Sequence, residues 1–327
     1  MSERVEEVKD EVAKRGELVD DAIEDVLPLG STKALYEASR YLLEAGGKRL
    51  RPSILLLVTE AFGRDEGDYE GVMPAALAIE IVHSFTLIHD DIMDDDSLRR
   101  GVPSVHVKWD ESTAILAGDT LYSKAFEIML QSDAPPEEMI WIIRTLAETC
   151  TRICEGQAMD VDFEDMEEVS EEEYMEMIEK KTAVLFAASA GIGAILGGGN
   201  RNEVENLYEY GLKVGKAFQI QDDVLDLTAT SDRLGKTRAS DLVENKQTLI
   251  NIHARRNGVD TTLPANATDD EIEAKVKEIE EVGSIEYARG VAADLVNEGK
   301  RNLEVLPDSR AKRVLEDIAD YLVERDH

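Results

Sequence analysis

A single stretch of the chain, residues 75–100, joins an apolar segment to a cluster of carboxylates and reads AALAIEIVHSFTLIHDDIMDDDSLRR. Its first part is almost entirely apolar, which predicts a buried helix. Asp90 and Asp94 share one face of that helix, with Cβ atoms about 5–6 Å apart, and Asp91 is adjacent. Carboxylates this close repel one another unless a cation lies between them, and hard oxygen ligands suit Mg²⁺. The stretch therefore predicts a core helix that ends in a magnesium site.

The same arrangement occurs a second time, in FQIQDDVLDL at residues 218–227. Asp222, Asp223 and Asp226 again stand at positions i, i+1 and i+4, and they close the apolar stretch 214–220. One such cluster in a chain with 70 acidic residues is weak, because a solvated acidic face has the same appearance. Two copies, each closing an apolar helix and each followed by cationic residues, favour a metal-binding function.

Cationic side chains follow both acidic clusters and accompany glycine turns. Arg99 and Arg100 come shortly after Asp94. Because Mg²⁺ completes its coordination shell with phosphate oxygens, nearby guanidinium groups can hold the oxygens that the metal leaves free. Three further segments carry cations. These are GGKRLRP with Lys48, Arg49 and Arg51, EKKT with Lys181, and GKTRASDLVENKQ with Lys236 and Lys246. Together the cations predict a diphosphate ligand.

Helical periodicity extends over the rest of the chain and predicts an all-α fold. Apolar residues recur at spacings of three and four, for example at Leu35, Ala38 and Leu42, and sustained alternation of Val, Ile and Thr is absent. Glycine and proline breaks divide the chain into about a dozen helices. Since no composition shift marks a boundary, we expect one large helical domain over residues 1–327, with a surface insertion at 257–270.

The charge of the chain argues against a nucleic-acid partner and indicates a high-salt environment. The 327 residues include 70 acidic and 36 basic side chains, which gives a net charge of −34. No basic stripe is present that could hold a nucleic acid, so no nucleic-acid partner is expected. An acidic excess spread along the whole chain predicts a halophilic protein whose surface stays hydrated in concentrated salt.

Three further segments bear on the location of the protein. Cys150 and Cys154 lie one helical turn apart and are too few for a disulfide framework, which predicts free thiols in a reducing, cytoplasmic compartment. The charged residues 1–16 lack the apolar core of a signal peptide. The uncharged stretch 182–200 is rich in Ala and Gly, so we expect a closely packed core helix and no membrane insertion.

In combination these motifs resemble those of trans-isoprenyl diphosphate synthases of the polyprenyl synthetase family. The similarity runs from about Lys33 to beyond Leu249. It rests on GGKRLRP, HDDIMDDDSLRRGVPSVH, GQAMD, the pair Lys181 and Thr182, FQIQDDVLD, and GKTRASDL followed by Lys246. The resemblance implies a single helical bundle in which two aspartate-rich helices face each other across a central cavity.

The resemblance also implies roles for the matching positions. The principal Mg²⁺ ligands would be Asp90, Asp94 and Asp222, supported by Asp91, Asp223 and Asp226. These aspartates would hold three ions with the diphosphate of an allylic substrate, and with Lys181 they would form the catalytic set. The residues that would bind isopentenyl diphosphate are Lys48, Arg51, His83 and Arg100. Those that would bind the allylic diphosphate are Arg99, Lys181, Thr182, Gln219, Lys236 and Lys246.

The implied reaction forms a carbon–carbon bond between two prenyl diphosphates. Metal ions and cationic side chains stabilise the charge on the departing diphosphate, so that the C–O bond ionises to an allylic carbocation. The alkene of isopentenyl diphosphate attacks this cation, and loss of a proton gives a product five carbons longer. Apolar walls keep water from the cation. Members of the family are usually homodimers, so a homodimer is expected.

Phe85 is the residue that the resemblance connects with product length. It lies five residues before Asp90, about 7.5 Å deeper along the helix axis, and would form a floor under the growing chain beside the small Thr86. An ideal helix rotates Phe85 about 140° from Asp90, so a core phenylalanine is the alternative. In archaeal members this pair accompanies a twenty-carbon product, and an acidic chain fits such a source. We therefore expect geranylgeranyl diphosphate, with farnesyl and farnesylgeranyl diphosphate as alternatives.

Two positions depart from the family's pattern. Ala239 and Asn245 stand in the loop after the second acidic cluster, where the family usually has glycine. Asn tolerates a left-handed backbone. Ala239 raises the question of whether this loop keeps the family's backbone geometry.

Two other functions share parts of the pattern. A terpene cyclase has the first acidic motif but an Asn/Ser/Glu triad as its second, so FQIQDDVLDL and GGKRLRP oppose it. A Ca-binding helical module is the second alternative, because loop positions 1, 3, 5 and 12 are taken by Asp160, Asp162, Glu164 and Glu171. Asp165 at position 6 opposes this module, since the sharp turn of a calcium loop requires glycine there.

Overall fold

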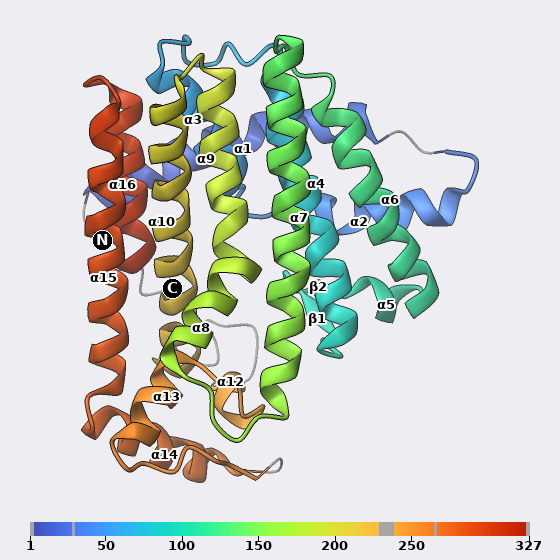
Figure 1. The fold of residues 1–327 in the computed structure, drawn as a ribbon. Helices are drawn as coiled ribbons and strands as arrows, with labels where there is room; N and C mark the ends of the chain where they lie inside the picture. Colours follow the sequence, from blue (N-terminus) through green and yellow to red (C-terminus); the bar gives the residue numbers. More distant parts are fainter. Residues whose placement is uncertain (1–2, 28–29, 229–238, 265–266, 325–327) are drawn as a thin grey trace. The chain divides into compact units, whose positions relative to one another are not determined.

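The computed structural model describes residues 3–27, 30–228, 239–264 and 267–324 (Figure 1). Its first helices are α1 (Glu3–Val26), α2 (Lys33–Glu44), α3 (Leu50–Ala61), α4 (Met73–Met93), α5 (Val105–Lys108), α6 (Glu111–Met129) and α7 (Pro136–Glu164). They are followed by α8 (Glu171–Ile178), the π-helical turn η1 (Glu179–Ala183), α9 (Val184–Leu196), α10 (Arg201–Thr228), α12 (Ser240–Val243), α13 (Leu249–Arg256), α14 (Asp269–Glu281), α15 (Ser284–Asn302), the 3₁₀ turn η2 (Leu303–Val305) and α16 (Arg310–Glu324). The predicted all-α class is confirmed.

The chain folds into two compact units. The first contains the described parts of Met1–Ala147, Ala188–Leu207 and Val305–Asp317, and the second those of Glu148–Ala187, Tyr208–Glu304 and Ile318–His327. The first acidic cluster belongs to the first unit and the second cluster to the second unit. The organisation as a single domain with a surface insertion at 257–270 stays a prediction.

The core of the first unit is built on α4, which packs against α3 and α6. Its apolar residues are nearly all buried, as their pattern in the sequence predicted. Gly118 of α6 lies so close to α4 that a Cβ atom there would overlap the ring of His89. His89 also places its Nε2 atom 3.1 Å from the Ile115 carbonyl oxygen, which ties the two helices together next to the first acidic cluster.

A short hairpin follows the end of α4 and positions the two arginines. Strands β1 (Leu98–Arg99) and β2 (Val102–Pro103) pair antiparallel, with Arg99 opposite Val102. The two residues between them, Arg100 and Gly101, have φ angles of 54° and 76°. Two successive positive φ angles are typical of a type I′ turn, whose twist matches that of the strands. The glycine and proline at 101–103 predict a break here, but no pattern in the sequence predicts the strands.

In the second unit, α7, η1, α9 and α10 approach one another through glycines. A Cβ atom on Gly156 of α7 would overlap the backbone of Lys180 and Lys181. On α10, Gly211 and Gly215 lie equally close to the backbone of α9 and η1. Helix α14 packs against α13 and α15 at one end of this unit (Figure 1).

The structure decides three of the sequence-based expectations. Residues 182–195 are buried, so the predicted core helix is confirmed, and no described helix is long and apolar enough to cross a membrane. Cys150 and Cys154 are free thiols, as predicted. The calcium module is wrong, because its first three proposed ligands lie within α7, which stays helical to Glu164 and leaves no loop for them.

Candidate active site

The first acidic cluster lies where α4 ends. Asp90 and Asp94 are half-buried, and the Asp94 amide donates to the Asp90 carbonyl at 2.9 Å, so they share one side of the last turn. Asp91 is fully buried and accepts a 2.6 Å hydrogen bond from Arg99 Nε. Burial raises the pKa of Asp91 to about 6, although Arg99 acts to lower it. Its second oxygen, Oδ2, is buried without a hydrogen-bond partner.

Arg99 is therefore held by carboxylates of its own chain. Besides Asp91 it contacts Asp96, with Nη2 at 2.8 Å from Oδ2. The resemblance assigned Arg99 to the allylic diphosphate, and in this structure its guanidinium lies against the acidic cluster. A phosphate oxygen would have to share the guanidinium with these two carboxylates.

Three of the four residues predicted to bind isopentenyl diphosphate, Arg51, His83 and Arg100, lie near one another in the first unit. Arg51 Nη1 lies 3.3 Å from His83 Nε2. Burial and then the nearby Arg51 hold the pKa of His83 well below its usual value, so the imidazole is neutral. Arg100 Nη1 donates to the Leu42 carbonyl at 3.0 Å and to the Gly46 carbonyl. Arg100 thus contacts the glycine turn that precedes the exposed Lys48.

Arg49 and Glu80 form a buried pair that the sequence analysis did not identify. Arg49 was grouped with the phosphate-binding cations, but it is only 2% exposed and donates to Asp20 at 2.6 Å and to Glu80. Glu80 also lies 3.6 Å from Arg100. Arg49 therefore ties the GGKRLRP turn to α1 and α4, and Glu80 fixes Arg100. A carboxylate inside the apolar stretch 75–88 was the signal for this role.

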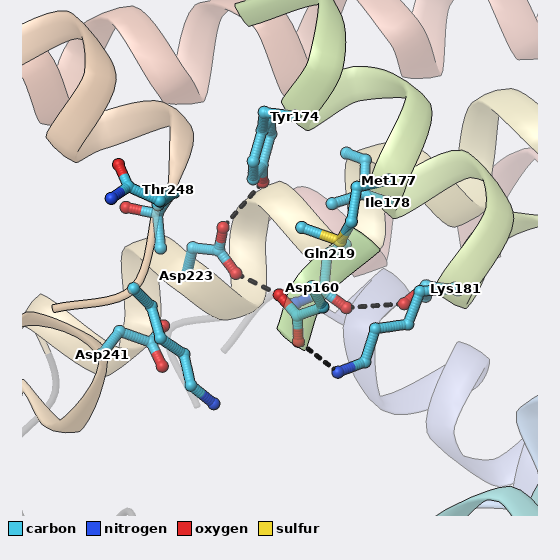
Figure 2. A pocket seen from close by; sticks show the side chains of 12 residues that line it. Asp160, Tyr174, Met177, Ile178, Lys181, Gln219, Asp223, Asp241 and Thr248 are labelled. Carbon is cyan, nitrogen blue, oxygen red and sulfur yellow. Dashed lines mark hydrogen bonds and ion pairs between the residues drawn. The ribbon is translucent and has the colours of Figure 1, made fainter. Parts of the chain in front are cut away.

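A pocket of about 90 Å³ lies in the second unit beside the second acidic cluster (Figure 2). Lys181 Nζ lies 2.6 Å from Asp160 Oδ2. Thr182 Oγ1 donates to Gln219 Oε1 at 2.8 Å, and Gln219 Nε2 donates to Asp223 Oδ1 at 2.9 Å. The remaining lining residues are Tyr174, Met177, Ile178, Asp241, Lys246, Gln247 and Thr248. Four predicted allylic-site residues, Lys181, Thr182, Gln219 and Lys246, thus line one pocket.

The three aspartates of the second cluster differ in their surroundings. Asp223 is buried, and its Oδ2 accepts a 2.7 Å hydrogen bond from the Tyr174 hydroxyl. Burial raises the pKa of Asp223 to about 7. Asp226 accepts hydrogen bonds from the Ser240 hydroxyl at 2.7 Å and from the Asp241 amide at 3.1 Å, and burial raises its pKa as well. Asp222, like Asp226, is half-buried.

Lys246 reaches the pocket from a loop with an unusual backbone. Its amide donates to the Asp241 carbonyl at 2.8 Å, and its carbonyl accepts from Asn251 Nδ2 at 2.9 Å. Ala239 and Asn245 have φ angles of 56° and 62°, so both take the left-handed conformation that glycine would adopt with less strain. The loop thus keeps a glycine-like backbone without glycine. Lys236, the other predicted cation of this loop, lies outside the described residues.

Phe85 is 6% exposed and belongs to an aromatic row between α4 and α6. Its ring lies edge-on to His89, with centroids 6.0 Å apart, and to Tyr122 at 5.4 Å. Tyr122 in turn contacts Phe126 at 5.2 Å. Both the chain-length role and the core-phenylalanine alternative are compatible with this burial, and the role stays a prediction.

The oxygen donors at these positions suit Mg²⁺. Within the described ranges, no three or more His, Cys, Asp or Glu side chains are grouped so that they alone could hold a metal. Mg²⁺ does not require such a cage, because it usually takes one or two carboxylates and completes its shell with water and substrate phosphate. The unpartnered, buried Oδ2 of Asp91 beside Asp90 fits a cation or a metal-bound water.

Among the pocket residues that were not predicted as site residues, Tyr174 and Asp241 lie closest to the chemistry of the second acidic cluster. Tyr174 lies in EEEYMEMI, where nothing distinguishes it from a core residue, and only the fold brings its hydroxyl to Asp223. Asp241 was quoted within GKTRASDL but received no role. Burial, together with the neighbouring Asp226 and Asp223, raises its pKa well above the usual value.

Comparison with known proteins gives one consistent result. A family model described as Polyprenyl synthetase matches residues 32–284. The chain is 56% identical to a geranylfarnesyl diphosphate synthase of Natronomonas pharaonis over 98% of both proteins. It is 51% identical to a geranylgeranyl diphosphate synthase of Methanosarcina mazei, over 97% of this chain and 98% of the relative.

Solved structures agree with the sequence comparison. A geranylgeranyl pyrophosphate synthetase of Pyrococcus horikoshii matches with a TM-score of 0.93 at 40% identity, over 99% of this chain and 100% of the other. A geranylgeranyl pyrophosphate synthetase of Geoglobus acetivorans matches with a TM-score of 0.90 at 45% identity, over 96% of this chain and 99% of the other. The similarity extends over nearly the whole length of each protein.

Proposed function

The chain belongs to the polyprenyl synthetase family, and we propose that it condenses isopentenyl diphosphate with an allylic diphosphate to make geranylgeranyl diphosphate. It is a short-chain trans-prenyl diphosphate synthase of isoprenoid biosynthesis. The main product, the primer and the role of each residue are parts of the proposal. The observation that carries it is the pocket in which Lys181, Thr182 and Gln219 meet beside the second acidic cluster (Figure 2).

The allylic diphosphate is held by cations and hydroxyl groups. Lys181 and Lys246 supply ammonium groups at the pocket. The Thr182 hydroxyl donates its one proton to Gln219, so it would have to exchange that hydrogen bond for one to a phosphate oxygen. Lys236 and Arg99 complete this proposed set. Because these donors are positioned before the reaction, they stabilise the charge that grows on the diphosphate as the C–O bond breaks.

The metal ligands are the half-buried carboxylates at the ends of the two acidic helices. Asp90, Asp94 and Asp222 are the proposed ligands and would hold Mg²⁺, which would supply Lewis-acid stabilisation of the departing diphosphate. Asp91, Asp223 and Asp226 are the proposed supporting carboxylates, and they accept hydrogen bonds from Arg99, Gln219 and Ser240. Three ions per site are proposed from the resemblance.

Isopentenyl diphosphate binds at Lys48, Arg51, His83 and Arg100. His83 is neutral and can donate only one ring proton, while the two arginines provide charge. Glu80 holds the Arg100 guanidinium against the glycine turn, so that little side-chain entropy is lost on binding. With the diphosphate fixed, the alkene attacks the allylic cation and a proton is lost.

A product assay tests the proposal directly. The protein is incubated with labelled isopentenyl diphosphate and dimethylallyl, geranyl or farnesyl diphosphate in turn, and the products are separated by chain length. We expect a twenty-carbon product that requires Mg²⁺ and disappears with EDTA. No extension from any primer in the presence of Mg²⁺ would refute the prenyltransferase assignment.

A twenty-five-carbon product is the second candidate. It is favoured by the relative from Natronomonas pharaonis, which is described as a geranylfarnesyl diphosphate synthase and is 56% identical to this chain. Phe85 favours the shorter product, because a buried ring in the wall between α4 and α6 leaves less room for a growing chain. The ratio of the two products in the same assay decides between them.

We also propose that the protein is a homodimer and that α6 carries the contact surface. Ile115 and Tyr122 lie two turns apart on one face of α6, and both are exposed, as are Leu116 and Leu130. An exposed apolar stripe on an otherwise highly charged chain is typical of a surface that a second copy covers. Sedimentation equilibrium should give a dimer that dissociates in Ile115→Asp, and a monomeric wild type would refute the proposal.

A further inference from the structure

We propose that Glu179 is a positioning residue that clamps the π-helical turn η1 between α7 and α10, so that Lys181 and Thr182 face the pocket. The inference rests on the proposed function, in which these two side chains bind the allylic diphosphate. Glu179 touches neither the pocket nor either acidic cluster, and it acts only through the turn that it begins.

The clamp consists of one carboxylate and two cations, namely Glu179, Arg152 and Lys216. Arg152 Nη2 on α7 donates to Glu179 Oε1 at 2.6 Å, and Lys216 Nζ on α10 donates to Glu179 Oε2 at 2.8 Å. Arg152 also donates to the Tyr208 hydroxyl at 3.2 Å. Burial acts to raise the pKa of Glu179, but the hydrogen bonds from Lys216 and Arg152 outweigh it and lower the pKa. The carboxylate therefore stays charged and joins both helices.

The turn that Glu179 begins needs such support. A π-helical turn contains one residue more than an α-helical turn, is rare, and occurs frequently at functional sites. The extra residue rotates everything after it by about 100° relative to an α-helix. Unless tertiary contacts hold it, the segment would relax to α-helix and turn Lys181 and Thr182 away from their partners. The register of η1 therefore decides where the two side chains point.

Both neighbouring helices hold η1 at three successive levels. The contacts on α7 come from residues four apart, so α7 presents one face to the turn. Those on α10 come from the adjacent residues 215 and 216 and from Gln219, which lies three residues further along the helix. On α7 the levels are Arg152 against Glu179, Gly156 against the Lys181 backbone, and Asp160 against the Lys181 ammonium. On α10 they are Lys216 against Glu179, Gly215 against Ala183, and Gln219 against the Thr182 hydroxyl. The clamp is the first level, and the pocket contacts of Figure 2 are the third.

Glu179→Gln tests the clamp with little change of shape. An amide has one acceptor oxygen, so its NH₂ group must face either Arg152 or Lys216, and a donor then meets a donor. The cluster is partly exposed, so we expect a moderate effect, about a three- to tenfold rise in KM for the allylic diphosphate. The KM for isopentenyl diphosphate should stay unchanged, because its proposed binding residues lie outside this segment.

Glu176→Gln is the matched control. Glu176 lies on α8 one turn before η1 and pairs with Lys180 at 2.9 Å, but its side chain is exposed and reaches neither α7 nor α10. It should leave both KM values unchanged. If Glu179→Gln lowers the unfolding temperature but raises neither KM, Glu179 is only structural and the inference is wrong. Equal effects of the two variants would also refute it.

Amide hydrogen exchange separates this inference from the proposed function. The clamp predicts faster exchange at residues 181–184 in Glu179→Gln than in the wild type, and no change in Glu176→Gln. If the wild type fails to extend any primer, the proposed function is wrong, and faster exchange still supports the clamp. If the wild type is active and exchange at η1 is unchanged in Glu179→Gln, the clamp is refuted while the proposed function stands.

Discussion

Phe85 is the residue at which product length can be tested with one substitution. Removing its ring opens space in the aromatic row between α4 and α6, so Phe85→Ala should shift the product by one or more five-carbon units. The lost burial should also lower the free energy of unfolding by about 3–5 kcal/mol. Chromatography of the products measures the shift in chain length, and urea unfolding measures the loss in the free energy of unfolding.

Phe85→Leu is the control for this experiment. Leucine keeps most of the apolar volume, so the product should remain mainly at the wild-type length while stability falls only slightly. If Phe85→Ala is folded and its product distribution equals that of the wild type, the ring is a core residue without a role in chain length. The burial of Phe85 would then serve only the packing of α4 on α6.

Ala239 has a left-handed backbone conformation, from which the effect of a glycine substitution on stability can be predicted. A left-handed conformation costs an alanine about 1–2 kcal/mol, whereas glycine adopts it freely and loses about 0.5–1 kcal/mol through unfolded-state entropy. Ala239→Gly should therefore raise the free energy of unfolding by up to about 1 kcal/mol. Prenyl transfer should be unaffected, because the loop keeps its conformation. Urea unfolding and the product assay measure both.

Ala254→Gly should have the opposite sign. Ala254 is buried within α13, where a glycine costs helix stability by about 1 kcal/mol. If both variants destabilise the protein equally, the left-handed strain at Ala239 is not released by glycine. From the sequence, Ala239 is only a departure from the family's pattern, and the φ angle of 56° supplies the physical reason for glycine at that position.

At the scale of the element, α4 was predictable and η1 was not. The apolar run of α4 and its closing aspartates are local features, so periodicity was enough to place Asp90 and Asp94 at the end of a buried helix. The π-helical turn depends on contacts with α7 and α10, which no local pattern encodes. The pair formed by Arg49 and Glu80 was missed for the same reason. A cation after a glycine turn has the same sequence signal whether it faces a ligand or a buried carboxylate.

Gly156 tests the contact between α7 and η1. In Gly156→Ala the added methyl group would overlap the backbone of Lys180 and Lys181, so η1 must move away from α7. We expect a loss of about 1–3 kcal/mol in the free energy of unfolding, together with a raised KM for the allylic diphosphate. Thermal unfolding and steady-state kinetics measure the two effects.

Gly290→Ala is the matched substitution for this element. Gly290 lies within α15 and has open space around its Cα, so alanine there should stabilise the helix by about 1 kcal/mol. The kinetic constants should not change. If Gly156→Ala behaves like Gly290→Ala, then α7 and η1 are not in the close contact described above, and Gly156 has no role in placing Lys181.

At the scale of the whole molecule, the chemistry is spread over two compact units. The proposed isopentenyl diphosphate set and the first acidic cluster belong to one unit, and the pocket of Figure 2 with the second cluster belongs to the other. Both clusters were predictable because each is a repeated local pattern. Tyr174, Glu80 and Asn251 were not, since each acts on a residue that only the fold brings near.

The net charge of −34 should slow the association of anionic substrates at low salt concentration. The Debye length falls from about 30 Å at 0.01 M salt to about 3 Å at 1 M, so KCl should screen the repulsion between the acidic surface and the prenyl diphosphates. We expect kcat/KM to rise by about tenfold over this range, with a smaller change in kcat, because screening acts on association. NaCl at equal ionic strength should act alike if screening is the cause. A kcat/KM that peaks in dilute buffer, while circular dichroism shows a folded protein, would refute the halophilic assignment.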